Sequence, residues 1–418
     1  MKKVKYINAI RLKLHKVLVE AVLTGLQEIF VLNKQADKVV EQLLKSNKKW
    51  GARDRAFLAE NIYEMCRWWR LINFSAGISE PLDSTDYWTL FATWLTIKPL
   101  HFSLENNQDL PQWAEFEGMD LEDILKRYRE GLETRSIAES IPDWLDETGA
   151  SELGDNWDTE LMALNKQAPV VLRVNTLKTD IATVSSIFGP DETGLIPGVP
   201  HAVVLKKRQN VFSRDSFKMG YFEVQDAGSQ LIAPYLDVHP GQTVIDACAG
   251  AGGKTLHIAS LLENRGKIVA MDLDLRKLHE LERRAKRNGV TCIKTDVIHS
   301  EKDIRALKET ADRLLLDVPC SGLGVLRRNP DSKWKLKPSF LDAIRKTQWQ
   351  ILTGYSAMVK PGGKMVYATC SILPSESEEQ VKRFVLERGH QWRLVSEQRT
   401  SVARDGFDGF YMALLEKQ

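Results

Sequence analysis

Residues 243–255 read Thr-Val-Ile-Asp-Ala-Cys-Ala-Gly-Ala-Gly-Gly-Lys-Thr, and this stretch decides the fold of the second half of the chain. Thr243–Ala247 is a short apolar run typical of a buried strand, and Lys254–Leu262 has helical character. The glycines between them let the backbone approach a ligand closely, because no Cβ intervenes. The start of a helix also offers free N–H groups, so the pattern favours a site for a nucleotide or an adenosyl group.

Two better-known glycine motifs fit this turn imperfectly. The phosphate loop G-x-x-x-x-G-K-[ST] shares Gly253-Lys254-Thr255, but its first glycine falls on Cys248. The dinucleotide fingerprint G-x-G-x-x-G begins well at Gly250, but its third glycine falls on Thr255. A tight turn without a ligand is the remaining alternative.

Two aspartates follow the next predicted strands. Asp272 comes after the strand Lys267–Met271, at a position where an acid can accept hydrogen bonds from ribose hydroxyls. A helix begins soon after it, so a helix cap is the alternative. Asp296 follows a possible third strand and could face an adenine amino group, although a plain loop aspartate fits its position equally well.

Strands and helices continue to alternate along the chain. Further apolar runs end at Leu316 and Ala368, and a helix over Arg276–Asn288 stops at Gly289, a good C-terminal signal. The alternation predicts an α/β domain over residues 225–418 with a doubly wound parallel sheet. Such sheets bind ligands at the carboxyl ends of their strands.

Two cysteines lie just past these strands. Cys320 follows one in Leu316-Asp-Val-Pro-Cys-Ser-Gly322, and Cys370 follows another in Tyr367-Ala-Thr-Cys-Ser371. A free cysteine is usually a small buried hydrophobe, and we interpret Cys66, Cys248 and Cys292 in that way. Two cysteines at the sheet edge where a ligand is expected favour a catalytic role for both.

Methylation of carbon 5 of a pyrimidine is a reaction that needs thiols. A thiolate that adds to carbon 6 breaks the aromaticity of the ring and makes carbon 5 enamine-like, so that carbon 5 can attack a methyl donor. Asp317 cannot promote the thiolate by attraction, but it could hydrogen bond to the ring nitrogen or the exocyclic amine of the base. A second thiol could help to remove the proton from carbon 5.

A basic segment follows Cys320. Its cationic and aromatic side chains are Arg327, Arg328, Lys333, Trp334, Lys335 and Lys337. Cations for phosphates and a ring for stacking suit single-stranded nucleic acid. Next to a candidate active site we predict an RNA contact, with a solvated basic face as the alternative.

The front of the chain has a different character. Apolar residues recur at helical spacing over Val17–Phe30 and Arg53–Leu71, and the acidic stretch 121–160 also reads as helical, broken at Pro142. Residues 1–60 carry 13 Lys and Arg against 6 Asp and Glu, whereas residues 101–160 carry 4 against 17. The net charge of +2 therefore hides a basic front end, which either contacts phosphates or is simply solvated, and an acidic stretch of open role.

Composition and spacing bound the remaining possibilities. Residues 151–224 hold short β-type runs between turn signals, so a small α+β subdomain is expected between an all-helical domain (1–150) and the sheet domain (225–418). Five scattered cysteines with no CxxC pair predict free thiols and no metal site. No signal peptide or membrane-length apolar run is visible. A cytoplasmic monomer without a membrane partner is expected.

At these motifs the chain resembles the RsmB/Sun-type (NOL/NOP/Sun) RNA 5-methylcytosine methyltransferases. The likeness covers residues 165–418 and rests on the segments 172–175, 225–230, 246–255, 317–322, 327–334, 369–371 and 408–415. It is weaker over 1–150, where Arg53–Phe57 with Ile62 and Tyr63 is similar to the NusB-like helical domain of the bacterial ribosomal RNA members.

The resemblance implies a Rossmann-like fold and methylation of a cytosine in RNA, with 16S ribosomal RNA favoured as the substrate. Cys370 would be the nucleophile, Cys320 would assist proton removal and product release, and Asp317 would hold the cytosine near Lys254. S-adenosylmethionine would be bound by Cys248, Ala249, Gly250, Ala251, Gly252, Gly253, Lys254, Asp272, Asp296 and Asp317. The family usually has proline where Ala251 stands, a difference that removes no functional group.

Other functions stay open on the sequence. A DNA cytosine-5 methyltransferase shares the Pro-Cys motif, but the Glu-Asn-Val motif that such enzymes carry is absent. A small-molecule methyltransferase would need neither the basic segments nor the long front end. Transfer RNA is the alternative substrate. A non-catalytic RNA-binding assembly factor is the alternative class, and it would bind RNA but not S-adenosylmethionine.

Overall fold

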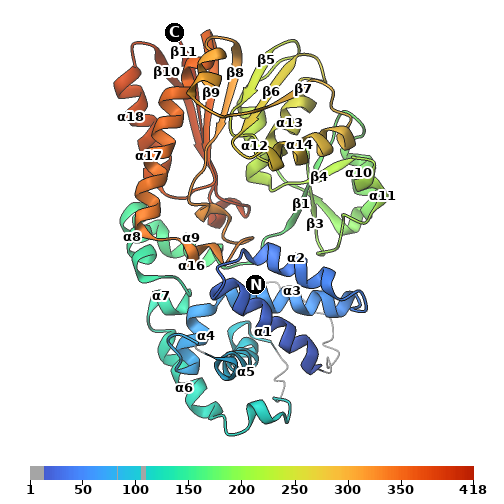
Figure 1. The fold of residues 1–418 in the computed structure, drawn as a ribbon, viewed down its shortest axis with the longest axis vertical. Helices are drawn as coiled ribbons and strands as arrows, with labels where there is room; N and C mark the ends of the chain where they lie inside the picture. Colours follow the sequence, from blue (N-terminus) through green and yellow to red (C-terminus); the bar gives the residue numbers. More distant parts are fainter. Residues whose placement is uncertain (1–13, 82, 105–109) are drawn as a thin grey trace. The chain divides into compact units, whose positions relative to one another are not determined.

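The computed structural model describes residues 14–81, 83–104 and 110–418, and the chain forms two compact units (Figure 1). One unit comprises the described residues up to Thr148 together with residues 329–336, and the other comprises residues 149–328 and 337–418. Residues 1–13 of the basic front end and 105–109 of the acidic stretch lie outside the described residues. Within the described ranges, no helix is both long enough and apolar enough to cross a membrane.

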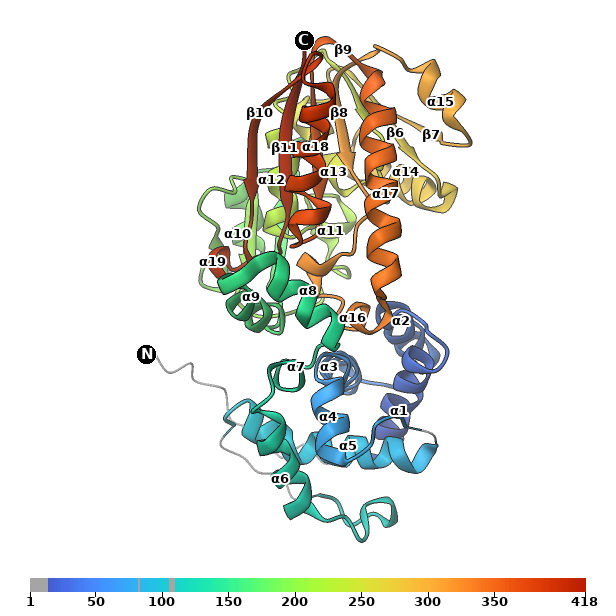
Figure 2. The ribbon, with the colours of Figure 1, turned by 90° about the vertical axis from the view of Figure 1, so that its left-hand side faces the viewer.

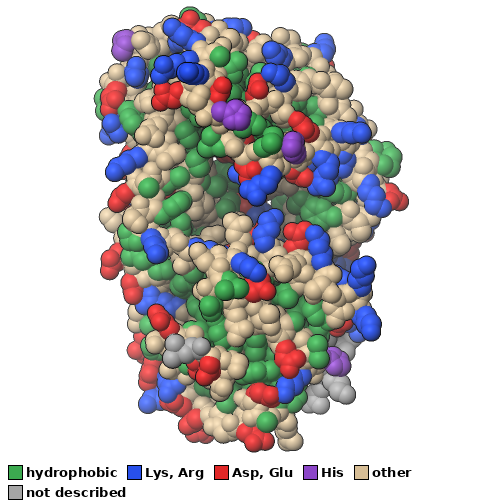
Figure 3. Space-filling view, viewed as in Figure 1, with side chains coloured by type: hydrophobic (Ala, Val, Ile, Leu, Met, Phe, Trp, Pro, Cys, Tyr) green, Lys and Arg blue, Asp and Glu red, His purple; other side chains and the backbone are tan. Residues whose placement is uncertain are grey.

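The first unit is helical where it is described. Its elements are α1 (Lys16–Phe30), α2 (Ala36–Ser46), α3 (Ala52–Arg67), α4 (Trp69–Ala76), α5 (Ser84–His101), η1 (Ala114–Phe116), α6 (Leu121–Gly131), α7 (Arg135–Ala138), the first part of α8 (Asp143–Leu153), and α16 (Ser332–Lys335). Leu26, Ile62 and Trp94 lie fully buried in its core. The single helix predicted over Arg53–Leu71 is two helices, because the backbone leaves the helical region at Trp68 (φ −103°, ψ 21°). Acidic side chains gather at the bottom of Figure 3, in the part of this unit to which α6 belongs.

The second unit begins with a small antiparallel sheet. Its elements are η2 (Gly154–Asn156), α9 (Trp157–Leu164), β1 (Val170–Val174), α10 (Ile181–Phe188), η3 (Pro190–Glu192), β2 (Thr193–Leu195), β3 (Ala202–Leu205), α11 (Asp215–Lys218) and β4 (Phe222–Val224). The strand order is β2-β3-β1-β4. Alternate residues of β1, Leu172 and Val174, pack with Phe188 of α10 and Phe222 of β4 in a separate apolar core. The short β-type runs expected at Val170–Leu172, Val203–Leu205 and Tyr221–Val224 form β1, β3 and β4, and β2 is a further strand.

A seven-stranded sheet forms the rest of the second unit. Its strands are β5 (Thr243–Asp246), β6 (Lys267–Asp272), β7 (Ile293–Val297), β8 (Ala311–Asp317), β9 (Val359–Thr369), β10 (Trp392–Arg399) and β11 (Tyr411–Lys417). Its helices are α12 (Ala227–Tyr235), α13 (Gly253–Leu261), α14 (Leu275–Asn288), α15 (Glu301–Ala306), η4 (Leu323–Val325), α17 (Pro338–Tyr355), η5 (Ser356–Met358), η6 (Pro374–Glu376), α18 (Glu378–Arg388) and α19 (Val402–Asp405). The order across the sheet is β10-β11-β9-β8-β5-β6-β7.

Helices cover both faces of this sheet (Figures 1 and 2). Val244, Leu315 and Val366 point to the face covered by α12, α13 and α14. Their chain neighbours Ile245 and Leu314 point to the other face, which α17 and α18 cover. Because side chains alternate along a strand, each central strand is apolar on both faces, and the expected α/β, Rossmann-like architecture is confirmed.

The sheet is mixed, so the prediction of a fully parallel sheet is wrong. Strands β7, β6, β5, β8 and β9 run parallel, but β11 is antiparallel to both β9 and β10. The reason is the short connection of residues 400–410 between β10 and β11. A parallel pair needs a long crossover, usually a helix with its flanking loops, so this connection returns the chain in the opposite direction.

The sheet order brings three loops together. Strand β8 lies between β5 and β9 and is parallel to both, with Leu315 opposite Asp246 and Asp317 opposite Ala368. The carboxyl ends of these strands therefore meet at one edge. The glycine loop, the loop with Cys320 and the loop with Cys370 all start there.

Candidate active site

The glycine loop has the shape of a cradle. Gly250 (φ 53°) and Gly252 (φ 86°) have left-handed backbones that other residues rarely adopt. A Cβ at Gly252 would lie 2.4 Å from Cγ of Leu281, so this glycine allows α14 to approach the loop. Added Cβ atoms at Gly250 and Gly253 would meet nothing within 4 Å. The open space beside these two glycines, at the start of α13, fits a bound adenosyl cofactor.

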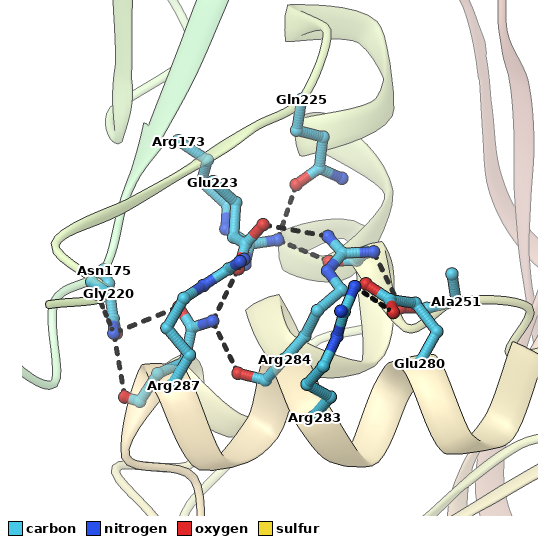
Figure 4. Close-up of polar contacts among 12 residues, drawn as sticks. Arg173, Asn175, Gly220, Glu223, Gln225, Ala251, Glu280, Arg283, Arg284 and Arg287 are labelled. Atoms are coloured by element: carbon cyan, nitrogen blue, oxygen red, sulfur yellow. Dashed lines mark hydrogen bonds and ion pairs between the residues drawn. The ribbon is translucent and has the colours of Figure 1, made fainter. Parts of the chain in front are cut away.

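Two arginines hold the backbone of this loop from behind (Figure 4). Arg284 of α14 donates to the carbonyl oxygen of Ala251 at 2.7 Å, and Arg173 of β1 donates to the carbonyl oxygen of Gly253. Arg173 also donates to Oε1 of Gln225 at 2.5 Å. Burial lowers the pKa of the Arg173 guanidinium to about 9. The two arginines therefore fix two carbonyl oxygens of the loop and hold its backbone in place.

Glu223 of β4 ties the small sheet to α14 in the same network (Figure 4). Its carboxylate is 3% exposed and accepts hydrogen bonds from Arg284 (3.0 Å), Arg287 and Asn288 (2.5 Å). Burial opposes ionisation of Glu223, but the two arginines outweigh it and lower its pKa. Residues of the small sheet and of helix α14 therefore position one glycine loop.

Of the two predicted ribose and adenine acids, Asp272 contacts the glycine loop directly. Both carboxylate oxygens of Asp272 accept backbone N–H groups, from Gly250 and Asp274 at 2.9 Å each. The cap of α14 is Asp274 and not Asp272, because the Asp274 side chain accepts from the N–H of Arg276. Asp296 lies within β7 and not after it, and pairs with Lys294 at 2.9 Å. Their contact with the cofactor stays a prediction.

The two cysteine loops place their sulfur atoms side by side. Sγ of Cys320 lies 3.3 Å from Sγ of Cys370, and both residues are half-buried. The hydrogen bond with Cys370 raises the pKa of the Cys320 thiol well above its usual range, and burial and the charge of Cys370 add to this effect. Cys320 therefore keeps its proton and can donate a hydrogen bond to the Cys370 sulfur.

Lys254 and Asp317 form an ion pair beside the sulfurs. Nζ of Lys254 lies 2.5 Å from Oδ2 of Asp317, and the two side chains are 13% and 27% exposed. Burial disfavours the charged form of Lys254, but Asp317 and Cys370 outweigh it and raise the pKa of Lys254. The raised pKa keeps the ammonium group of Lys254 charged beside the Cys370 sulfur.

Asp246 is a site residue that sequence reasoning did not single out. It ends β5 and is 1% exposed; Oδ2 accepts from the Thr255 hydroxyl at 2.7 Å, whereas Oδ1 has no hydrogen-bond partner. Burial raises its pKa to about 7, opposed by Thr255 and reinforced by the nearby Asp317. Its place at the head of the motif, directly before the glycine loop, was the available signal.

Glu376 is a second residue that sequence reasoning missed. It is fully buried in η6 and accepts hydrogen bonds from Ser321 and Ser371, the residues that follow the two cysteines. Its only signal is a glutamate six residues after Cys370, in a run with no recognisable pattern. The pairing depends on tertiary structure.

The predicted RNA contacts have internal partners. Arg327 donates to the carbonyl oxygen of Gly406 at 2.9 Å and is 7% exposed. Arg328 binds the carboxylates of Asp226 (2.6 Å) and Asp408 (2.5 Å). Trp334 packs in the helical unit. These contacts give the three side chains structural roles, so RNA contact by them stays a prediction and does not enter the proposal below.

Metal chemistry has no candidate centre in the part of the chain that the structure describes. There, no three His, Cys, Asp or Glu side chains cluster in a way that could hold a metal ion.

Comparison with known proteins identifies similar sequences. A family model described as 16S rRNA methyltransferase RsmB/F matches residues 233–415, and the ferredoxin-like domain of RsmF/B-like methyltransferases matches residues 141–212. The chain is 34% identical to ribosomal RNA small subunit methyltransferase B of Vibrio vulnificus over 308 residues, which is 70% of this chain and 71% of that protein. It is 36% identical to a probable ribosomal RNA small subunit methyltransferase B of Synechocystis, but spans only 58% of that relative's length and 61% of its own.

Solved structures share the fold. The crystal structure of PH0851 matches 97% of this chain and all of that chain, with a TM-score of 0.79 and 24% identity. NSun6 from Pyrococcus horikoshii, solved with SFG, matches 66% of this chain and 98% of that chain, with a TM-score of 0.61 and 20% identity.

Proposed function

The chain belongs to the RsmB/F family of 16S rRNA methyltransferases, and from this premise we propose that it methylates carbon 5 of a cytosine in small-subunit ribosomal RNA through a covalent bond from Cys370. It is a methyltransferase whose cofactor is S-adenosylmethionine. The observation that carries the proposal is the pair of sulfurs 3.3 Å apart, at the sheet edge that also holds the glycine loop. The cytoplasm, where ribosomal RNA and the cofactor meet, is its proposed location.

The cofactor supplies an electrophilic methyl group when bound. The backbone of residues 248–253 and Lys254 would hold it, with Asp272 and Asp296 at its ribose and adenine. The open space at Gly250 and Gly253 and the free N–H groups at the start of α13 support this assignment. The arginines behind the loop keep the cradle in place before binding.

Cys370 is the proposed nucleophile. The Lys254 ammonium group interacts with its sulfur, and the Cys320 thiol can donate a hydrogen bond to it. A bond forms from the Cys370 sulfur to carbon 6 of cytosine, the carbon 5–carbon 6 double bond opens, and its electron pair becomes available at carbon 5 for the methyl group. The Asp317 carboxylate would accept a hydrogen bond from the exocyclic amine as the ring is held.

Cys320 is the proposed base for the second half of the reaction. Once Cys370 is bonded to carbon 6, its sulfur is no longer negative, so the main cause of the raised pKa of Cys320 disappears. Cys320 then loses its proton to solvent and its thiolate takes the proton from carbon 5. The carbon 5–carbon 6 double bond re-forms, the carbon 6–sulfur bond breaks, and its electron pair returns to Cys370.

Covalent trapping tests this assignment. Wild type, Cys320→Ala and Cys370→Ala are each mixed with unmodified small-subunit ribosomal RNA and labelled S-adenosylmethionine, with Cys292→Ala as the matched control. We expect labelled 5-methylcytosine with wild type and the control, an RNA adduct on a denaturing gel with Cys320→Ala, and neither with Cys370→Ala.

Each other outcome changes the assignment. An adduct with Cys370→Ala instead of Cys320→Ala would exchange the roles of the two cysteines. Label on transfer RNA alone would change the substrate. RNA binding by a wild type that binds no S-adenosylmethionine in a titration would overturn the enzymatic proposal.

A further inference from the structure

The Glu376 carboxylate is a buried hub between the two cysteine loops. Oε1 accepts from the hydroxyls of Ser321 (2.5 Å) and Ser371 (2.6 Å). Oε2 accepts from the Ser321 N–H (2.8 Å) and from Nε2 of Gln348 (3.0 Å). Hydrogen bonds to a carboxylate are stronger than those between neutral groups, so four donors fix this side chain firmly.

The donors belong to the segments that carry the sulfurs. Ser321 follows Cys320 after β8, and Ser371 follows Cys370 after β9. The two serine hydroxyls also lie 3.2 Å apart. One carboxylate therefore fixes the residue next to each sulfur, so that a change at Glu376 acts on both thiols at once.

Glu376 is itself anchored by the scaffold. Its carbonyl oxygen accepts from the hydroxyl of Tyr367 at 2.7 Å. The preceding residue, Ser375, is held by Glu152, which accepts its N–H at 2.9 Å and its hydroxyl at 2.8 Å. Gln348 links the hub back to the cysteine loop by donating to the carbonyl oxygen of Pro319 at 3.0 Å. The hub thus has rigid support from strand β9 and helix α17.

The charge of Glu376 acts on the Cys320 thiol. Among the groups that raise the pKa of the Cys320 thiol, Cys370 comes first and Glu376 follows. Tyr367 also faces this pair, and burial with the charges of Cys320 and Glu376 raises its pKa. Cys370 in turn helps to raise the pKa of Lys254. The surroundings therefore favour a protonated Cys320.

We propose that Glu376 is a positioning residue that holds Cys320 and Cys370 at reacting distance and keeps Cys320 in its thiol form before the base is attacked. The inference rests on the proposed function for its effect on turnover. Its effect on the thiols does not depend on that function.

Two substitutions separate the reach of the side chain from its charge. Glu376→Gln keeps the size but replaces one acceptor with a donor, which faces donors from Ser321 or Gln348. Glu376→Asp keeps the charge but shortens the side chain. Glu379→Gln is the matched control, because Glu379 is exposed three residues further along.

Methyl transfer is the first measurement. We expect kcat of Glu376→Gln to fall about 100-fold, as for a displacement of reacting groups by about 1 Å, while KM for S-adenosylmethionine stays within about threefold because the glycine loop is separate. Glu376→Asp should also lose kcat, and Glu379→Gln should match wild type. Wild-type kcat in both Glu376 variants would overturn the inference.

The pH profile of thiol alkylation is the second measurement, and it needs no RNA. In the Cys370→Ala background, the midpoint for alkylation of Cys320 should move to lower pH with Glu376→Gln and stay with Glu376→Asp. A role confined to folding would change the rate without moving the midpoint, and an unmoved midpoint overturns the inference. If wild type transfers no methyl group to cytosine, the proposed function fails, and this profile still decides the role of Glu376.

Discussion

Asp246 is an ionisable side chain that the fold removes from water. At the end of β5 it is 1% exposed, and its Oδ1 atom has no hydrogen-bond partner. Burial of a carboxyl group disfavours its charged form, which explains a pKa of about 7 beside the Asp317–Lys254 pair. When Asp246 is neutral, the charge of Lys254 interacts mainly with Asp317 and Cys370.

Replacing Asp246 should therefore change how stability depends on pH. The folded pKa of about 7 lies above the ordinary value of 3.8, so the folded state holds the proton more tightly and the wild type loses stability as pH rises from about 4 to about 7. At 1.36 kcal/mol per unit the loss is roughly 4 kcal/mol. Asp246→Asn removes this titration and keeps an acceptor for Thr255.

The measurement is the melting temperature of both proteins at several values of pH. The difference between them should move in favour of Asp246→Asn as pH rises from 4 to 7 and then level off. Because the other ionisable groups are shared, their effects cancel in the difference. A constant difference across this range would contradict the raised pKa.

At the scale of elements, the glycine loop depends on a network that begins outside the large sheet. Strands β1 and β4 of the small sheet supply Arg173 and Glu223, and α14 supplies Arg284. Arg173 and Arg284 reach carbonyl oxygens of the loop, and Glu223 fixes Arg284 (Figure 4). The small sheet therefore supports the cofactor site through its polar contacts.

Loss of the Glu223 charge should weaken cofactor binding. Glu223→Gln leaves Arg284 and Arg287 without their buried anion, and a buried charge without its partner is strongly destabilising. We expect the Kd for S-adenosylmethionine to rise about tenfold, equivalent to about 1.4 kcal/mol, as measured by titration calorimetry.

The matched control lies on the same helix. Glu280 pairs with Arg283 at 2.5 Å on the more exposed side of α14, and such surface pairs contribute little. Glu280→Gln should bind the cofactor as wild type does. Equal Kd values for Glu223→Gln and wild type would show that the loop does not need this network.

At the scale of the whole molecule, one segment leaves the sheet unit and completes the helical unit. Residues 329–336 lie between Arg328, which binds Asp226 and Asp408, and α17. In the helical unit, Nε1 of Trp334 donates to the carbonyl oxygen of Cys66 at 2.6 Å. The buried Lys333 donates to the carbonyl oxygen of Arg67 at 2.8 Å. The chain therefore passes from the sheet unit into the helical unit and back.

Trp334→Ala should destabilise the helical unit. The ring is partly buried, so we expect a loss of about 2–3 kcal/mol, less than the roughly 3–5 kcal/mol for a fully buried tryptophan. Hydrogen exchange should become faster in α3 and α4. Phe340→Ala, at a side chain that is 40% exposed in α17, is the control. Unchanged exchange with a raised KM for RNA would instead support the predicted RNA contact.

The sequence by itself determined the local elements and the chemistry they carry. Strand β5, the glycine turn and α13 follow from apolar patterning and from glycines whose backbones other residues rarely adopt. Order along the chain also placed Cys320 and Cys370 at strand ends. These features depend on neighbours in sequence, so the α/β fold and the cofactor could be predicted and are confirmed. The domain boundaries and the roles of single site residues stay predictions.

Only the tertiary structure decided which distant groups meet. The antiparallel β11, the Glu376 hub, the arginines behind the glycine loop and the place of Trp334 in the helical unit all join residues far apart in the chain. A buried carboxylate and a surface carboxylate look the same in a sequence. Their partners and pKa values differ because packing sets the distances and removes water, and neither is a property of the local residue pattern.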